Sequence, residues 1–326
     1  MGFSLLKKLA LLSAALCCSA CLLCACGGNG GAADESAAVS PPAVASMAET
    51  PEGKRDNTTL VLKPEASGNS TLQQDTVTVD VSNASQGYIM IKYDGDVPLV
   101  KMQLTAPDGF TTYTYTVSRH GSFETFPLSA GSGTYTVGIF ENVKDDRYST
   151  VLKESFEVQL ENDFLPFLYP NQYVNFTDKT KAVAQGKELA EDAENDFDVV
   201  EQVYQYVTGN VIYDDEKAAT VTAGYLPNVD ETLKTEKGIC FDYASLMTAM
   251  LRSQRIPTKL QVGYSGEVYH AWISVYTEED GWLDNVIEFD GNSWQLVDPT
   301  FASNNESSDV ADYVGDGTNY LLKYSY

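Results

Sequence analysis

The segment from Cys240 to Leu251 constrains the fold of this chain more than any other. Its helix-forming residues are apolar on nearly every side, and a helix of that kind has to be buried all round. The rest of its domain must therefore build a core with this helix at the centre. Gly238 precedes the segment and Ile256-Pro257 ends it. We expect Cys240 to stand at the first turn of a central helix.

The first 26 residues have the pattern of an export signal. Two lysines at positions 7 and 8 precede an apolar stretch over 9–23, which is shorter than the roughly 20 residues of a membrane-spanning helix. The stretch closes with LCAC at positions 23–26, which resembles the lipobox of bacterial lipoproteins. We expect a lipoprotein signal peptide over 1–26, lipidation of Cys26, and a membrane-anchored lipoprotein exported to the bacterial cell surface. An uncleaved anchor and an ordinary signal peptide are the alternatives.

The chain has six cysteines, and five of them lie in this leader. Cys240 is the sixth, so an exported chain has no second body cysteine with which to form an internal disulfide. A lone thiol of this kind is either a small buried hydrophobe or a reactive group. At the start of a helix, the dipole and the free backbone N–H groups favour an anion. We therefore expect a lowered thiol pKa for Cys240.

The composition bounds the partners and the organisation. A net charge of −25 repels nucleic acid, so we expect no nucleic-acid partner. Residues 27–56 are rich in small and polar residues and contain almost no large apolar side chain, which predicts a flexible tether. The remaining length is enough for two domains, which we place at 57–160 and 161–326.

Residues 57–160 have the pattern of an all-β domain. Residues 76–81 alternate between apolar and polar side chains, and further strand-like runs lie at 88–93, 135–140 and 156–160, separated by turn signals. Short strands at this spacing favour an immunoglobulin-like sandwich. His120 is the only histidine of this region, and we expect it in a solvated loop.

Residues 161–326 mix helical and strand patterns. Helices are expected over 180–193 and 196–207, and a short extended segment at 211–213. Strand patterns over 259–264 and 269–276 follow the central helix, and a third over 293–297 leads into Asp298. This order places a thiol on a helix before a histidine and an aspartate on successive strands.

These three residue types suit thiol-based acyl chemistry. A thiol is mostly protonated at neutral pH, and an imidazole can take its proton. The same ring then protonates the leaving amine, while a carboxylate orients the ring. His270 is the only histidine of its domain. A buried structural Cys240, a structural His270 and an Asp298 that only forms a turn before Pro299 are the competing interpretations.

The motifs around these residues resemble those of the bacterial transglutaminase-like superfamily. They are GICFDYA at 238–244, HAW at 270–272 and DPT at 298–300, with IYD at 212–214 upstream, and the resemblance covers roughly 165–326. It implies an α+β fold with a papain-like transglutaminase core, here preceded by the all-β domain. It further implies a catalytic triad of Cys240, His270 and Asp298, with Tyr213 as the candidate for stabilising the oxyanion. Calcium is not carried over, and we expect neither a cofactor nor a metal.

The resemblance implies a cysteine protease, an amidase or an acyltransferase. Cys240 would form a thioester with a peptide or glutamine carbonyl, and water or an amine would then release the acyl group. We favour hydrolysis over crosslinking. The partner would be a protein or peptide substrate, with cell-wall peptide among the candidates. The alternative is a non-catalytic binding or adhesion module at the cell surface that uses the same fold as a scaffold.

Overall fold

The computed structural model describes residues 55–265, 267–278, 281–289, 294–296 and 320–326. Cys26 and most of the leader and tether lie outside these residues, as does Asp298. In the described part of the chain, no helix is long and apolar enough to cross a membrane.

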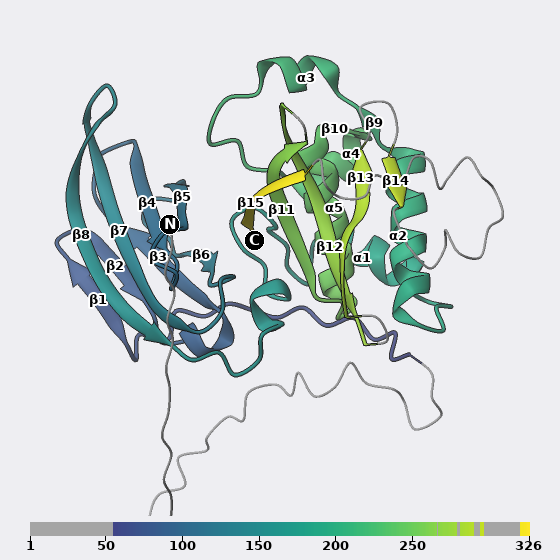
Figure 1. Ribbon diagram of the computed structural model, residues 1–326, viewed down its shortest axis with the longest axis horizontal. Coiled ribbons are helices and arrows are strands. Elements are labelled where there is room, and N and C mark those ends of the chain that lie inside the picture. The colour runs from purple at the N-terminus through teal and green to yellow at the C-terminus, as the bar shows by residue number, and fades with distance from the viewer. Residues whose placement is uncertain (1–54, 266, 279–280, 290–293, 297–319) are drawn as a thin grey trace, which may run out of the picture. The chain divides into compact units, whose positions relative to one another are not determined.

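The first region consists of strands that form two antiparallel sheets (Figure 1). Period-two alternation buries one face of each sheet, with Val79 and Ile91 in the first and Met102 and Val137 in the second, and these residues belong to one core cluster. The strand-rich character agrees with the alternation in the sequence, whereas the immunoglobulin-like type stays a prediction. The first sheet has the order β1-β2-β3-β6, and its strands are β1 (Thr71–Gln74), β2 (Val77–Asp80), β3 (Tyr88–Tyr93) and β6 (Glu124–Pro127). The second sheet has the order β5-β4-β7-β8, and its strands are β4 (Val100–Thr105), β5 (Thr112–Val117), β7 (Gly133–Lys144) and β8 (Arg147–Val158).

The second region is built around helix α5 (Cys240–Ser253), and its centrality is confirmed. Every residue from Asp242 to Ser253 is buried. Three further helices pack against α5: α1 (Lys181–Leu189), α2 (Asp196–Asn210) and α4 (Val229–Thr235). Helix α1 ends before the expected 193 because Asn195 caps a new helix, its side chain accepting the N–H of Asp198 at 2.9 Å.

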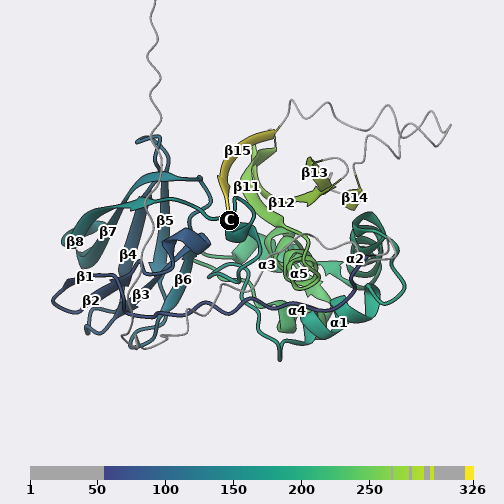
Figure 2. The same cartoon turned by 90° about the horizontal axis from the view of Figure 1, so that it is seen from below.

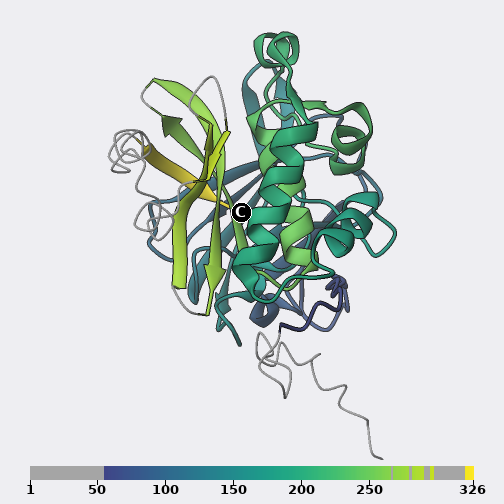
Figure 3. The ribbon, with the colours of Figure 1, turned by 90° about the vertical axis from the view of Figure 1, so that its right-hand side faces the viewer.

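A five-stranded sheet packs against the other side of α5 (Figure 3). Its order is β14-β13-β12-β11-β15 and all its pairs are antiparallel. The strands expected from the sequence are β11 (Thr258–Ser265), β12 (Val268–Thr277) and β14 (Trp294–Leu296). The structure adds β13 (Gly281–Phe289) and β15 (Tyr320–Ser325), and β15 forms an edge beside β11. This mixture of helices and sheets agrees with a transglutaminase-like core.

Contacts distant in sequence join the two regions (Figure 2). The Tyr113 ring lies 5.7 Å from the Tyr326 ring, and the hydroxyl of Ser129 donates to the carbonyl of Ser325 at 2.6 Å. The buried guanidinium of Arg252 donates to carbonyls of the connector between the two regions (159–180), of β11 and of Tyr326. The C-terminal strand therefore lies against the first region while it pairs with the sheet of the second.

Candidate active site around Cys240

Cys240 occupies the first turn of α5, as the sequence predicts, and Asp242 fixes that turn. Asp242 is fully buried, and its Oδ2 accepts the backbone N–H of Ile239 at 2.9 Å. The same carboxylate accepts Lys217 Nζ at 2.6 Å and the Tyr225 hydroxyl at 2.5 Å. A buried carboxylate needs such partners to offset its lost hydration. This network, from a short helix α3 (Asp215–Thr220) and the loop after it, supports the turn that carries the thiol.

Gly238 has a different role from the one its position near the thiol indicates. Next to a nucleophilic thiol, a glycine would leave room for a substrate to approach. In the structure, a Cβ added at Gly238 would lie 2.7 Å from Cβ of Asp242. The glycine is therefore required by the carboxylate that holds the start of α5.

Tyr213 reaches the thiol through backbone pairing. Strand β9 (Ile212–Tyr213) runs parallel to β10 (Lys237–Gly238), with Tyr213 opposite Gly238. The N–H of Asp214 donates to the Gly238 carbonyl at 2.9 Å. Burial raises the pKa of Tyr213, the nearby Cys240 thiolate raises it further, and a hydrogen bond from the backbone N–H of Cys240 opposes the rise. The phenol oxygen therefore lies at the amide and the thiol of Cys240.

Strand β12 supplies the other side of the site. Burial raises the pKa of the Cys240 thiol, while hydrogen bonds from the backbone N–H groups of Ala271 and Phe241 oppose the rise. Ala271 directly follows His270, so the start of α5 lies against the part of β12 that carries the histidine. Tyr269 lies on this segment too: burial raises its pKa, and the Cys240 thiolate is among the charges that raise it further.

His270 is 6% exposed, and burial lowers its pKa to about 4. The helix dipole predicts a lowered pKa for the Cys240 thiol, but this pKa is raised. The loss of hydration on burial outweighs the hydrogen bonds from the backbone N–H groups. Both effects disfavour charge, so a neutral thiol and a neutral imidazole are the favoured resting forms near pH 7.

The structure thus brings Tyr213 and the strand of His270 to Cys240. Asp298 and the lipidation candidate Cys26 lie outside the described residues, so their placement stays a prediction. Lys217 and Tyr225 could not be found from the sequence, because they belong to no local motif and are linked to the site only through the side chain of Asp242. Among the residues that the structure describes, no cluster of three or more histidine, cysteine or acidic side chains could hold a metal ion.

Comparisons with known proteins find similarity over the segment that carries these residues. A family model described as the transglutaminase-like superfamily matches residues 183–299, a segment that contains Cys240, His270 and Asp298. The uncharacterized protein YebA of Bacillus subtilis is 26% identical over a match that covers 40% of this chain and 21% of YebA. The UPF0252 protein MJ1282 of Methanocaldococcus jannaschii is 32% identical, covering 23% of this chain and 25% of that protein. The chain therefore spans a quarter or less of the length of these two relatives.

Two solved structures are similar at low identity. One, from Cytophaga hutchinsonii and named as a candidate cysteine protease, has a TM-score of 0.36 and 14% identity, covering 82% of this chain and 74% of that one. The other, named as a TGase, has a TM-score of 0.30 and 18% identity, covering 55% of this chain and 51% of that one.

Proposed function

Residues 183–299 belong to the transglutaminase-like superfamily, and from this premise we propose that the protein is a cysteine-dependent acyl-transfer enzyme with Cys240 as its nucleophile. The observation that carries the proposal is the packing of α5, which begins at Cys240, against β12, which carries His270. This packing holds the helix start against the strand of His270. A thiol at a helix start beside a histidine is the arrangement that nucleophilic acyl transfer needs.

The first half of the reaction forms a thioester. Cys240 Sγ attacks the carbonyl carbon of a peptide bond or a glutamine carboxamide, and His270 takes the thiol proton as the S–C bond forms. The oxyanion accepts hydrogen bonds from the backbone N–H of Cys240 and from the Tyr213 hydroxyl, both of which lie at the thiol. The intermediate then collapses, the C–N bond breaks, and His270 returns the proton to the leaving amine or ammonia.

The low pKa of His270 gives Asp298 a specific task in this proposal. A carboxylate within about 4–6 Å of the ring favours the imidazolium and raises its pKa by about 1–3 units. Burial alone holds the pKa of His270 at about 4. With Asp298 at the ring, the pKa would rise and His270 would be a stronger base. It would also fix the tautomer that accepts the thiol proton.

The second half of the reaction releases the acyl group. Attack by water gives hydrolysis, and attack by an amine gives crosslinking. We favour hydrolysis, with a protein or peptide substrate and cell-wall peptide among the candidates. The leader supports a location at the bacterial surface, anchored through lipid on Cys26. Replacing Cys26 with Ser should move the protein from the membrane fraction to the soluble fraction, and retention in the membrane would contradict the lipid anchor.

The test of the activity distinguishes hydrolysis from transfer to an amine. The full chain is incubated with a glutamine-containing peptide library and a fluorescent primary amine, in water enriched in ¹⁸O. Hydrolysis places ¹⁸O in the new carboxylate, whereas transfer places the amine on the peptide. Cys240→Ala should abolish both products. Product formation that survives Cys240→Ala would refute the nucleophile, and no product over the whole library would favour a non-catalytic binding module.

A further inference from the structure

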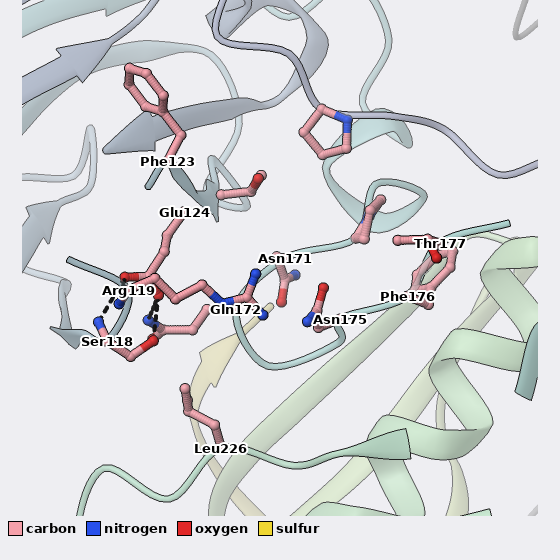
Figure 4. Close-up of a pocket in the computed structure, with 13 residues that line it drawn as sticks. Ser118, Arg119, Phe123, Glu124, Asn171, Gln172, Asn175, Phe176, Thr177 and Leu226 are labelled. Carbon is pink, nitrogen blue, oxygen red and sulfur yellow. Dashed lines mark hydrogen bonds between the residues drawn. The ribbon is translucent and has the colours of Figure 1, made fainter. Parts of the chain in front are cut away.

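A second site lies where the two regions meet. A cavity of about 140 Å³ is lined from both of them, by β6 and the loop before it, by the connector over 170–177 and by Leu226 (Figure 4). Two side chains of the connector, Asn171 and Gln172, are more than nine-tenths buried and line it. None of these groups takes part in the reaction proposed for Cys240.

The orientation of the Asn171 amide is fixed by its neighbours. Its Oδ1 accepts the backbone N–H groups of Tyr173 and Val174, each at 3.0 Å. The other end of the amide, Nδ2, is therefore the donor, and it is buried with no hydrogen-bond partner among the described residues. Asn171 offers this cavity an unsatisfied donor.

The Gln172 amide is held by its nitrogen end, whereas the Asn171 amide is held by its oxygen. Its Nε2 donates to the carbonyl of Thr116 and to Glu124 Oε2, each at 2.8 Å. Its Oε1 is therefore the acceptor, and it too is buried without a hydrogen-bond partner in the part of the chain that is described. Neighbouring residues thus present one unsatisfied donor and one unsatisfied acceptor.

Leaving such atoms unpaired is costly, because a buried polar group without a partner loses its hydration and gains no hydrogen bond in return, and native structures rarely retain one. Water can fill this role where a cavity is polar. A single water needs only about 10–15 Å³, and this cavity offers roughly ten times that volume. A cavity with one unpaired donor and one unpaired acceptor suits one common group, the peptide unit, whose C=O would accept from Asn171 and whose N–H, on the opposite edge of the trans unit, would donate to Gln172.

The cavity also has a positively charged side chain in its lining. Arg119 lines the same cavity, and its guanidinium makes no ion pair with any residue that the structure describes. The acid nearest in sequence, Glu124, is already engaged. Its carboxylate accepts the N–H and Oγ of Ser118, the N–H of Arg119 and Nε2 of Gln172. A ligand carboxylate is the group that Arg119 would pair with.

We propose that this cavity binds the C-terminal end of a peptide, with the last peptide unit on Asn171 and Gln172 and the terminal carboxylate on Arg119. Phe123, Phe176 and Leu226 also line the cavity and give an apolar wall for a side chain. The site is separate from Cys240 and binds without cleaving.

The test uses N-acetylglycine, which carries one peptide unit and one carboxylate. Binding to the full chain is measured by calorimetry or ligand-observed NMR, with an expected Kd of about 1 mM for so small a ligand. N-acetylglycinamide lacks the carboxylate and N-acetylsarcosine lacks the N–H, so both should bind at least about fivefold more weakly. These comparisons need no variant protein.

Variants then locate the site. Asn171→Asp keeps the acceptor for Tyr173 and Val174 but replaces the donor, and it should weaken binding about tenfold or more. Arg119→Gln should weaken it about three- to tenfold, whereas Arg147→Gln, exposed on β8, is the matched control and should not change it. Binding to Cys240→Ala should equal that of the wild type, which separates this site from the active site. No saturable binding at tens of millimolar (about 20-fold above the expected Kd), or binding that neither Asn171→Asp nor Arg119→Gln weakens, overturns the proposal in favour of ordered water alone.

Discussion

The buried histidine makes a prediction about stability that does not depend on catalysis. Burial lowers the pKa of His270 to about 4, against a reference value of about 6.5 for an unfolded chain. Between these two pH values the unfolded chain binds more protons than the folded one, so stability falls as the pH drops from 6.5 to 4 and this contribution is constant below that. A difference of about 2.5 units at about 1.36 kcal/mol per unit gives roughly 3 kcal/mol.

The perturbation that isolates this contribution is His270→Gln in the Asp298→Asn background, because glutamine carries no charge at any pH and the background removes the carboxylate proposed to raise the pKa of the ring. The free energy of unfolding of both proteins is measured with denaturant at pH 7.5, 5.5 and 4. Lost packing affects the variant equally at each pH, so it cancels when the differences are compared. The stability advantage of the protein with His270 over its glutamine variant should shrink by about 3 kcal/mol between pH 7.5 and 4. An advantage that stays constant, or grows as the pH falls, would refute a histidine held neutral by burial.

Three further predictions concern the active site. The rate of Cys240 alkylation by iodoacetamide should keep increasing above pH 9, since burial raises the thiol pKa. A rate that levels off near neutrality would show that the thiol pKa is lowered instead. Asp298→Asn should keep the fold and lower turnover roughly 10–10³-fold, measured as kcat beside a circular dichroism spectrum, and unchanged turnover would leave Asp298 as a turn residue. Gly238→Ala should lower the free energy of unfolding by about 1–3 kcal/mol, because the new Cβ meets Asp242; a variant as stable as wild type in urea would contradict that contact.

The central helix could be predicted because its signal is local. Apolar residues on nearly every side of 240–251 require burial wherever the helix lies, and the structure buries Asp242 to Ser253. Strands β11 and β12 follow from their own residues in the same way. Strand β13 was missed because its sequence mixes Asp284 and Asn285 with apolar residues, and its pairing with β12 depends on residues outside the strand.

The electrostatics of the site could not be read from the sequence. The position of Cys240 at a helix start was correct, but the helix dipole is only one contribution to its pKa, and burial by the surrounding fold is larger. The proximity of Tyr213 rests on a two-residue parallel pairing with Gly238, which no periodicity indicates. The donor–acceptor pair of Asn171 and Gln172 likewise exists only because distant backbone groups fix each amide.

The most direct test of the account is the mass of the intact protein during turnover. The full chain is mixed with a peptide substrate found in the library assay, quenched in acid within the first turnovers, and weighed by mass spectrometry. A thioester mechanism predicts an added mass equal to the acyl part of the substrate less the thiol hydrogen, located on the peptide that contains Cys240, removed by hydroxylamine and not formed by Cys240→Ala. Product release with no acyl adduct at any quench time, or an adduct on another residue, would contradict a thioester on Cys240.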